Sequence, residues 1–257
     1  MTEPVRYEVR GNVAELTMDQ PDTRNALSAA MLTSLAEALG RCASDEAVRV
    51  VVLTGAGTTF CSGADLRGGP DGPAFASAGP DLLADVLRTL LDHPKATIAR
   101  VQGHVAGGGN GLVAACDFAV ASADARFAFS EVRLGVAPAV VAVACLRVMD
   151  PRQAAALMLT GERFSAQRAR DAALVTDVVE PDALDATVAG WVRQLTYAAP
   201  GAVTATKELL RTVTGLDRQA ALEWTAALSA RLFRGPEAAE GIEAFMERRA
   251  PSWAPPG

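Results

Sequence analysis

A repeating order of strand, glycine turn and helix constrains the fold of this chain more than any other feature. Apolar runs over Val48–Leu53 and Thr97–Val101 predict strands that are buried on both faces, because a half-exposed strand would alternate apolar and polar residues. Glycine follows both runs, and small apolar residues then lead to another strand over Phe118–Ala121. Because βαβ units have this order, the sequence predicts an α/β fold with a covered parallel sheet.

Short sequence patterns also predict the structure of the segments around these strands. Alternating residues over Val5–Val9 and Val13–Met18 flank Gly11-Asn12 and predict a β-hairpin. Ser28 precedes a helix with apolar residues at the helical period. The stretch Gly68–Pro80 is rich in Gly and Pro and predicts a mobile surface loop before a helix over Asp81–Leu91.

Beyond Asp150 the pattern becomes helical, with one short strand candidate over Leu174–Val179. We therefore divide the chain into a sheet-containing core with the site, residues 1–195, and a helical region, residues 196–257. Apolar helix faces usually pack on their own domain, but a helical appendage to an α/β core is also a natural subunit interface. We expect residues 196–257 to form a homo-oligomer.

Composition excludes several classes of function. The 257 residues are 50% hydrophobic with a net charge of −6, which argues against a nucleic-acid or anionic-membrane surface. Neither a secretory signal nor an apolar run of about 20 residues occurs, so we expect a cytoplasmic protein with no membrane span. Four scattered cysteines and two histidines lack metal-ligand spacing, so we expect buried thiols and no metal.

Two segments, Thr59–Leu66 and His104–Gly111, place glycines where a strand ends. Backbone N–H groups at such turns are free to bind an anion or a polarised carbonyl oxygen. Two of them on one oxygen would form an oxyanion hole, worth about 3 to 4 kcal/mol per donor. The alternative is that these glycines only permit close packing of helix on strand. Neither segment matches a P-loop, a GxGxxG fingerprint or a GxSxG elbow.

Glu131 is the carboxylate that stands out. It lies between Phe127, Phe129 and Leu134, where poor solvation would raise its pKa toward neutrality and suit it to proton transfer. The alternative is a structural acid that pairs with Arg133. The residues alone favour neither interpretation.

Taken together, these segments resemble the enoyl-CoA hydratase/isomerase family, the crotonases. The residues that carry the resemblance are Phe60–Leu66, Gly107–Gly109, Cys116, Asp117 and Ser130–Pro138, in the family's order and spacing. The resemblance implies a spiral of ββα units followed by a helical trimerisation region, with trimers that often pair into hexamers. It also implies an acyl-CoA substrate, in which coenzyme A enters as part of the thioester, and no separate cofactor.

The resemblance also implies roles for individual residues. The amides of Ala64 and Gly108 would hold the thioester oxygen, and Glu131 would transfer the proton. The positions implied in substrate or CoA binding are Arg24, Ala26, Ser62, Asp65, Leu66, Gly107, Gly111, Pro138, Phe245 and Arg248.

The chain departs from the family at Gly111, where hydratases with two acids carry a glutamate. Three functions remain open: hydration with Glu131 as both base and acid, Δ3,Δ2-enoyl-CoA isomerisation, and acyl-CoA binding without turnover. The motifs resemble single-glutamate hydratases of the branched glutaconyl-CoA type most closely, which favours hydration. Gly111 would open space for the acyl chain beside apolar walls formed by Val136, Ala137, Ala139 and Val140. The alternative is that these small residues only serve the packing of helices, and the sequence does not decide between the two.

Overall fold

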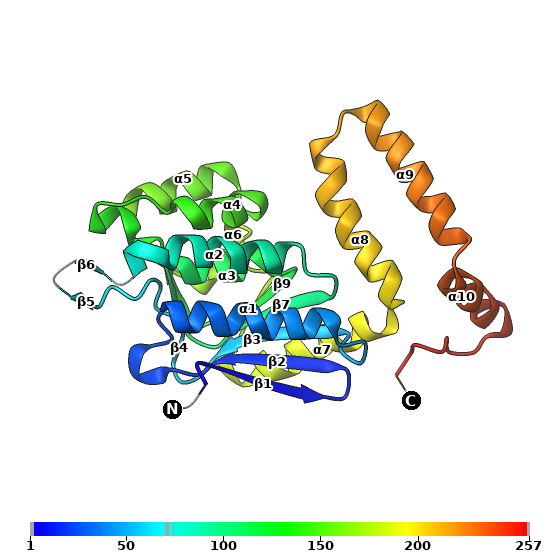
Figure 1. Cartoon of the computed structure of the whole chain (residues 1–257), viewed down its shortest axis with the longest axis horizontal. Helices are drawn as coiled ribbons and strands as arrows, with labels where there is room; N and C mark the ends of the chain where they lie inside the picture. Colours follow the sequence, from blue (N-terminus) through cyan, green and yellow to red (C-terminus); the bar gives the residue numbers. More distant parts are fainter. Residues whose placement is uncertain (1–2, 70–71, 74, 256–257) are drawn as a thin grey trace.

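The computed structural model describes residues 3–69, 72–73 and 75–255, and two β-sheets form its centre (Figure 1). The larger sheet has the strand order β1 (Val5–Arg10), β2 (Val13–Met18), β3 (Val50–Gly55), β7 (Ala96–Val101), β9 (Phe118–Ser122) and β12 (Asp177–Val179). The smaller sheet has the order β11 (Arg163–Ser165), β10 (Arg126–Ala128), β8 (His104–Ala106) and β4 (Thr59–Cys61). The two-residue strands β5 (Gly68–Gly69) and β6 (Gly72–Pro73) pair separately.

The chain winds through the two sheets as a repeated ββα unit. Strands β3, β7 and β9 pair in parallel in the larger sheet, and each is followed by a strand of the smaller sheet. The helices that complete these units are α2 (Phe75–Leu91), α3 (Gly108–Ala115) and α4 (Ala139–Val148). The predicted hairpin of β1 and β2 is confirmed, as is the helix α1 (Ala29–Ser44) with Ser28 as its N-cap.

Helices cover both faces of the larger sheet, as the apolar runs predict. Within β3, Val51 and Leu53 pack into the core with α1 and α2, whereas Val50 and Val52 pack against α7 (Leu184–Tyr197) on the other face. The remaining helices are α5 (Pro151–Thr160), α6 (Ala166–Asp171), α8 (Pro200–Thr212), α9 (Arg218–Phe233) and α10 (Pro236–Glu247), with short 3-10 helices η1 (Pro21–Thr23), η2 (Ser130–Leu134), η3 (Pro181–Ala183) and η4 (Val213–Gly215).

The prediction of a loop up to Pro80 is wrong for its described second half. Helix α2 begins at Phe75 and contains Pro80, although proline cannot donate a helical hydrogen bond. In the first turn of this helix the Phe75 ring packs on the core and lies directly against Gly79, which has no Cβ to collide with it. Residues 70–71 and 74 of the predicted loop lie outside the described part of the chain.

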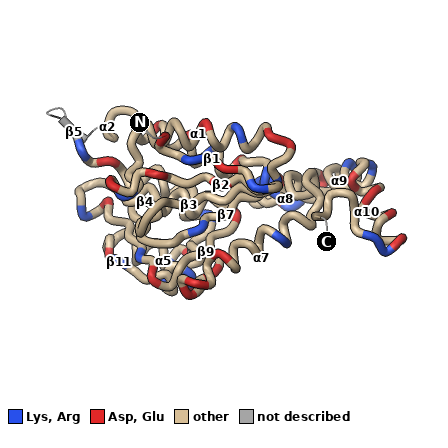
Figure 2. Tube along the Cα trace, turned by 90° about the horizontal axis from the view of Figure 1, so that it is seen from below, with Lys and Arg blue, Asp and Glu red and all other residues tan. Residues whose placement is uncertain are grey.

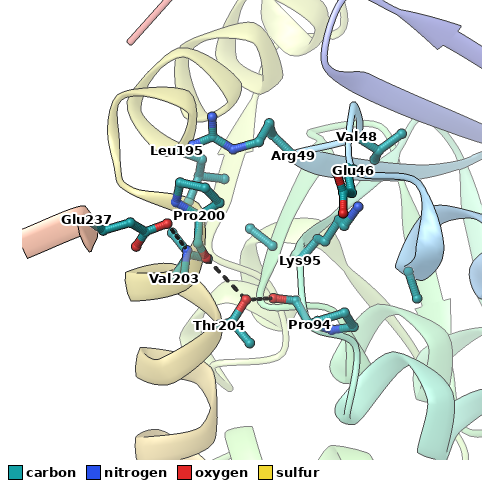
Figure 3. Close-up of a pocket in the computed structure, with 13 residues that line it drawn as sticks. Glu46, Val48, Arg49, Pro94, Lys95, Leu195, Pro200, Val203, Thr204 and Glu237 are labelled. Carbon is teal, nitrogen blue, oxygen red and sulfur yellow. Dashed lines mark hydrogen bonds between the residues drawn. The ribbon is translucent and has the colours of Figure 1, made fainter. Parts of the chain in front are cut away.

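The C-terminal helices α8, α9 and α10 lie at the end of the molecule opposite to β5 and β6 (Figure 1). A cavity of about 370 Å³ separates α8 from the core, and the Thr204 hydroxyl donates across this junction to the Pro94 carbonyl at 2.9 Å (Figure 3). Basic and acidic residues are interspersed along the chain and gather together at α10 (Figure 2). There Arg249 pairs with Glu240 at 2.8 Å and with Glu247 at 2.7 Å.

Candidate active site

An apolar cavity of about 410 Å³ lies where the predicted glycine turns meet. Four segments line it: the residues after β4, the first half of α2, the start of α3, and the stretch from η2 into α4. Its lining residues are Ser62–Ala64, Leu66, Phe75, Ala76, Pro80, Leu83, Gly107, Gly108, Ser130, Glu131, Leu134 and Val136–Val141.

The Ala64 amide is left free by the hydrogen bonds of its neighbours. Leu27 donates its N–H to the Gly63 carbonyl at 2.8 Å, and Asp65 donates its N–H to the Leu27 carbonyl at 3.3 Å. This parallel bridge uses the groups on either side of Ala64, whose own N–H has no acceptor in the described part of the chain. Gly63 has φ +89°, a conformation that favours glycine, so the turn that presents Ala64 depends on this residue.

Gly108 is the first residue of α3, and its N–H has no hydrogen-bond acceptor among the described residues. Gly107 precedes it with φ +49°, and the Asn110 side chain fixes the turn by donating to the Ala128 carbonyl at 2.8 Å. The two turns are adjacent, because a Cβ at Gly63 would lie 3.6 Å from the Gly107 Cα. Two unused amides therefore occur on neighbouring turns of one cavity.

Glu131 reaches the same turn from η2. Its Oε1 would lie 3.4 Å from a Cβ at Gly107, and its Oε2 is buried without a hydrogen-bond partner among the described residues. Burial raises the pKa of the Glu131 carboxyl, and a hydrogen bond from its own backbone amide opposes this shift. A buried oxygen without a hydrogen-bond partner costs about 1 to 3 kcal/mol of stability. Such an oxygen is more typical of a functional carboxyl group than of a structural one.

The aromatic residues just before Glu131 pack into the core. Phe127 and Phe129 are fully buried and both stack against Phe164, with ring centroids 5.7 and 6.1 Å apart. Gly135 then ends η2 with φ +81° and donates its N–H back to the turn. Arg133 does not pair with Glu131; its Nε donates to the Thr160 carbonyl at 3.2 Å. The proposed structural pair with Arg133 is therefore absent.

The cavity brings many of the predicted site residues together. Those that line it are Ser62, Ala64, Leu66, Gly107, Gly108, Glu131 and Pro138, together with the predicted apolar walls Val136, Ala137, Ala139 and Val140. Arg24, Ala26 and Asp65 lie outside the lining. Arg24 accepts the Ser62 N–H at 3.0 Å through its carbonyl, and the Asp65 carboxylate binds Arg67 at 2.7 Å, which lowers the Asp65 pKa.

Three other predicted residues do not meet the cavity in this chain. Phe245 is 81% exposed on α10, and Arg248 caps the same helix. In Figure 1, α10 lies far from α4, which forms one wall of the cavity. Gly111 is buried and opens no space, because a Cβ there would lie 2.9 Å from Cγ1 of Val141. The expectation that Gly111 widens the acyl pocket is wrong, since Val141 fills that position.

Sequence reasoning missed the contribution of α2. Phe75, Pro80 and Leu83 line the cavity from α2, although the sequence predicts a loop up to Pro80. The available signal was Phe75 itself, an aromatic residue within a Gly- and Pro-rich stretch. The missed residue at the other wall is Val141, which lies in the first turn of α4.

The cysteines match the expectation of buried thiols. Cys42, Cys61, Cys116 and Cys145 are all free and buried, and burial raises the pKa of Cys61 and of Cys116 to about 12. In the described ranges no three His, Cys, Asp or Glu side chains are grouped closely enough to hold a metal ion. Those ranges also contain no helix of the length and hydropathy needed to cross a bilayer.

Comparison with known proteins agrees with this geometry. A family model described as enoyl-CoA hydratase/isomerase matches residues 8–256. An (E)-benzylidenesuccinyl-CoA hydratase of Thauera aromatica is 33% identical over 97% of this chain and 98% of that protein. A carnitinyl-CoA dehydratase of Salmonella arizonae is 34% identical over 98% of this chain and 99% of that protein.

Solved structures show the same fold. An enoyl-CoA hydratase of Mycobacterium smegmatis superposes with a TM-score of 0.89 at 35% identity, covering 97% of this chain and 98% of that one. The predicted ββα spiral with a helical C-terminal region is confirmed by this likeness. Since both the family model and the relatives span nearly its whole length, the chain belongs to the enoyl-CoA hydratase/isomerase family, the crotonases.

Proposed function

We propose that this protein is a hydro-lyase that adds water to an α,β-unsaturated acyl-CoA thioester. The observation that carries the proposal is that the amides of Ala64 and Gly108 and the carboxylate of Glu131 line one apolar cavity. Neither amide has an acceptor, and Oε2 of Glu131 has no hydrogen-bond partner, among the described residues. The relatives named as hydratases and dehydratases support the same reaction.

The amides of Ala64 and Gly108 supply the electrostatic part of the mechanism. Both would donate to the thioester oxygen, where negative charge develops as the reaction reaches its enolate-like state. Preorganised donors in an apolar cavity stabilise that charge at about 3 to 4 kcal/mol each, because they need no reorganisation. No separate cofactor is required, since coenzyme A is part of the substrate.

Glu131 supplies the proton chemistry. As a carboxylate it accepts a proton from water while the water oxygen bonds to the β-carbon. The same carboxyl then delivers a proton to the α-carbon, which restores the carboxylate and completes the addition of one water. Burial raises the pKa of Glu131, which brings its two protonation states closer in free energy near neutral pH.

The acyl group that fits this cavity is uncharged. Glu131 is the single titratable residue among the described lining residues, and the undescribed residues 1–2, 70–71, 74 and 256–257 include no Lys, Arg or His. A second carboxylate on the substrate would be buried near Glu131 without a cationic partner, which is unfavourable. This charge pattern supports an uncharged acyl group over the branched glutaconyl type suggested by the motifs.

The remaining predicted residues keep supporting roles in the proposal. Ser62, Leu66, Gly107 and Pro138 would contact the substrate directly from the cavity wall. Arg24, Ala26 and Asp65 would bind coenzyme A outside the lining. This assignment is supported by the backbone hydrogen bonds that join Arg24 and Leu27 to the segment around Ala64.

We also propose that residues 196–257 assemble the protein as a homotrimer or hexamer around the core, residues 1–195. Large apolar side chains on the C-terminal helices are exposed in the single chain. They are Leu222, Phe233, Ile242, Phe245 and Met246, each at least 52% exposed. Phe245 and Arg248 would then meet the coenzyme A site of a neighbouring copy. A cytoplasmic location stays a prediction.

Δ3,Δ2-isomerisation is the second candidate, because the lone Glu131 would suffice to move a proton between carbons without activating water. An acyl-CoA-binding protein without turnover is the third. Hydration is tested by incubating the protein with crotonyl-CoA, because it lowers the absorbance of the conjugated thioester. Isomerisation is tested with a 3-enoyl-CoA, because it raises that absorbance.

We expect the protein to hydrate crotonyl-CoA at least tenfold more efficiently, by kcat/KM, than the glutaconyl-CoA that bears a terminal carboxylate. The physical reason is the unpaired burial of the second charge, where about 1.4 kcal/mol corresponds to tenfold. The measurement is the decay of the conjugated absorbance with each thioester. Equal efficiency on the two substrates, or a preference for the charged one, would contradict the uncharged acyl class.

A further inference from the structure

Val141 occupies the boundary between the cavity and α3. Its side chain is 3% exposed in the first turn of α4, and the residue also lines the cavity. On its other side it covers Gly111, whose Cβ position lies 2.9 Å from Cγ1 and 3.1 Å from Cβ of Val141. Leu87 of α2 closes the same position at 3.3 Å. The valine therefore fills the space that the missing side chain at Gly111 leaves.

The position of Val141 along α3 relates it to the reacting bond. Gly108 and Gly111 are three residues apart on this helix, a rise of about 4.5 Å. The amide proposed to hold the thioester oxygen therefore lies about one helical turn from Gly111, the residue that Val141 covers. An acyl chain that extends from that oxygen site toward Gly111 would bring its α- and β-carbons close to Val141.

Other residues of the cavity wall limit the size of the acyl group less than Val141 does. Val136 is 58% exposed and Leu134 is 58% exposed, so both lie at the mouth of the cavity and have room to move. Val141 is held between α2, α3 and α4, and its methyl groups are packed against Gly111 and Leu87. A close-packed valine yields little, because displacing it would disturb three helices.

We propose that Val141 is the residue that limits the bulk of the acyl group near the β-carbon, an inference that rests on the proposed acyl-CoA site. The contact with Gly111 fixes the position of the Val141 methyl groups. Shortening Val141 opens the cavity toward Gly111. Adding a methyl group at Gly111 pushes Val141 toward the substrate.

The test compares the binding of two saturated thioesters that cannot be hydrated, butyryl-CoA and the bulkier 3-phenylpropanoyl-CoA, by titration calorimetry. Val141→Ala removes two methyl groups and is expected to raise the affinity ratio of the bulky to the small thioester about tenfold, the lower end of what a methylene-sized change in an apolar pocket gives. Gly111→Ala adds one methyl group and is expected to lower the ratio about tenfold. The double variant is expected to return toward the original ratio, because the methyl group added at Gly111 fills part of the space that Val141→Ala opens.

Val143→Ala is the matched control, since Val143 lies on the same helix but is 66% exposed and outside the cavity. It is expected to leave the ratio unchanged. Circular dichroism verifies the fold of each variant, and Val141→Ala alone decides the outcome if Gly111→Ala does not fold. A ratio that Val141→Ala does not change would overturn the inference.

The same titrations in a Glu131→Gln background separate the inference from the proposed reaction. Binding of a saturated thioester does not need proton transfer, so the tenfold change in ratio is expected there as well. Absence of hydration in the unmodified protein would then count against the proposed reaction alone. Failure of the unmodified protein to bind either thioester would overturn both.

Discussion

Replacing Glu131 with glutamine is expected to lower kcat for hydration about a thousandfold, within the range that general acid–base catalysis supplies. Glutamine keeps the size of the side chain but neither accepts a proton from water nor delivers one to carbon. The amides of Ala64 and Gly108 belong to the backbone and remain, so the affinity for butyryl-CoA is expected to change less than threefold. The measurements are steady-state hydration of crotonyl-CoA and calorimetric titration with butyryl-CoA.

A matched variant tests whether the effect belongs to the position of Glu131. Glu162 lies beyond α5, is exposed, and is outside the cavity. Glu162→Gln makes the same change of charge and is expected to keep the original turnover. If Glu131→Gln retained more than a tenth of the activity, Glu131 would not be the proton-transfer residue.

The same substitution is expected to change how stability depends on pH. The fold raises the pKa of Glu131 above its usual 4.5, so the folded protein disfavours the ionised form. The unmodified protein therefore loses stability as the pH rises from 4.5 through the folded pKa. Glu131→Gln lacks this loss, so its free energy of unfolding relative to the unmodified protein is expected to increase across that window. Urea unfolding at about pH 4 and about pH 8 measures it; a relative stability independent of pH would contradict the raised pKa.

Much of the core was predictable because its signals are local. The hairpin of β1 and β2 depends on adjacent alternation around Gly11-Asn12, and α1 depends on the Ser28 cap, whose hydroxyl accepts the Met31 N–H at 3.2 Å. The apolar neighbours of Glu131 were also visible in the sequence, and the structure shows that one oxygen of its carboxyl is buried.

The smaller sheet was not predictable in the same way. Its strands β4, β8, β10 and β11 have three residues each, too short to show a period of two. Their pairing joins distant segments, such as Phe127 with Phe164. The Val141–Gly111 contact likewise depends on how α4 packs on α3, which no local pattern records. The sequence therefore predicts the residues at the glycine turns better than it predicts the parts of the cavity wall that α2 and Val141 form.

A second large effect concerns the junction between the core and the C-terminal helices. Lys207 of α8 is 7% exposed, and its ammonium binds the Asp117 carboxylate at 2.5 Å and the Lys95 carbonyl at 3.0 Å. The same Asp117 oxygen also accepts the N–H and the hydroxyl of Thr97, at 2.8 and 3.0 Å. This cluster joins α8 to the larger sheet at the end where strands β7 and β9 begin.

Lys207→Met is expected to lower the free energy of unfolding by about 3 kcal/mol, the lower end for breaking a buried ion pair, because Asp117 keeps partial contact with water. Methionine preserves the apolar length of the side chain but leaves the Asp117 charge without its cation. Adding Asp117→Asn removes that charge, so the double variant is expected to be more stable than Lys207→Met alone. Urea unfolding at one fixed protein concentration gives the three values.

Lys95→Met is the matched control, because Lys95 is the one other lysine of the chain and its ammonium contacts only the Asp45 carbonyl among the described residues. Its cost is expected to stay below about 1 kcal/mol, the range for a partly exposed cation without a close ion pair. A similar cost for both lysines would mean that burial of the stem, rather than the Asp117 charge, stabilises the junction. If the double variant were no more stable than Lys207→Met, the unpaired Asp117 charge would not be the cause. We therefore expect Lys95→Met to be the most stable of these variants, the double variant to be intermediate and Lys207→Met to be the least stable. This order follows from the pairing of the Asp117 carboxylate with Lys207 alone.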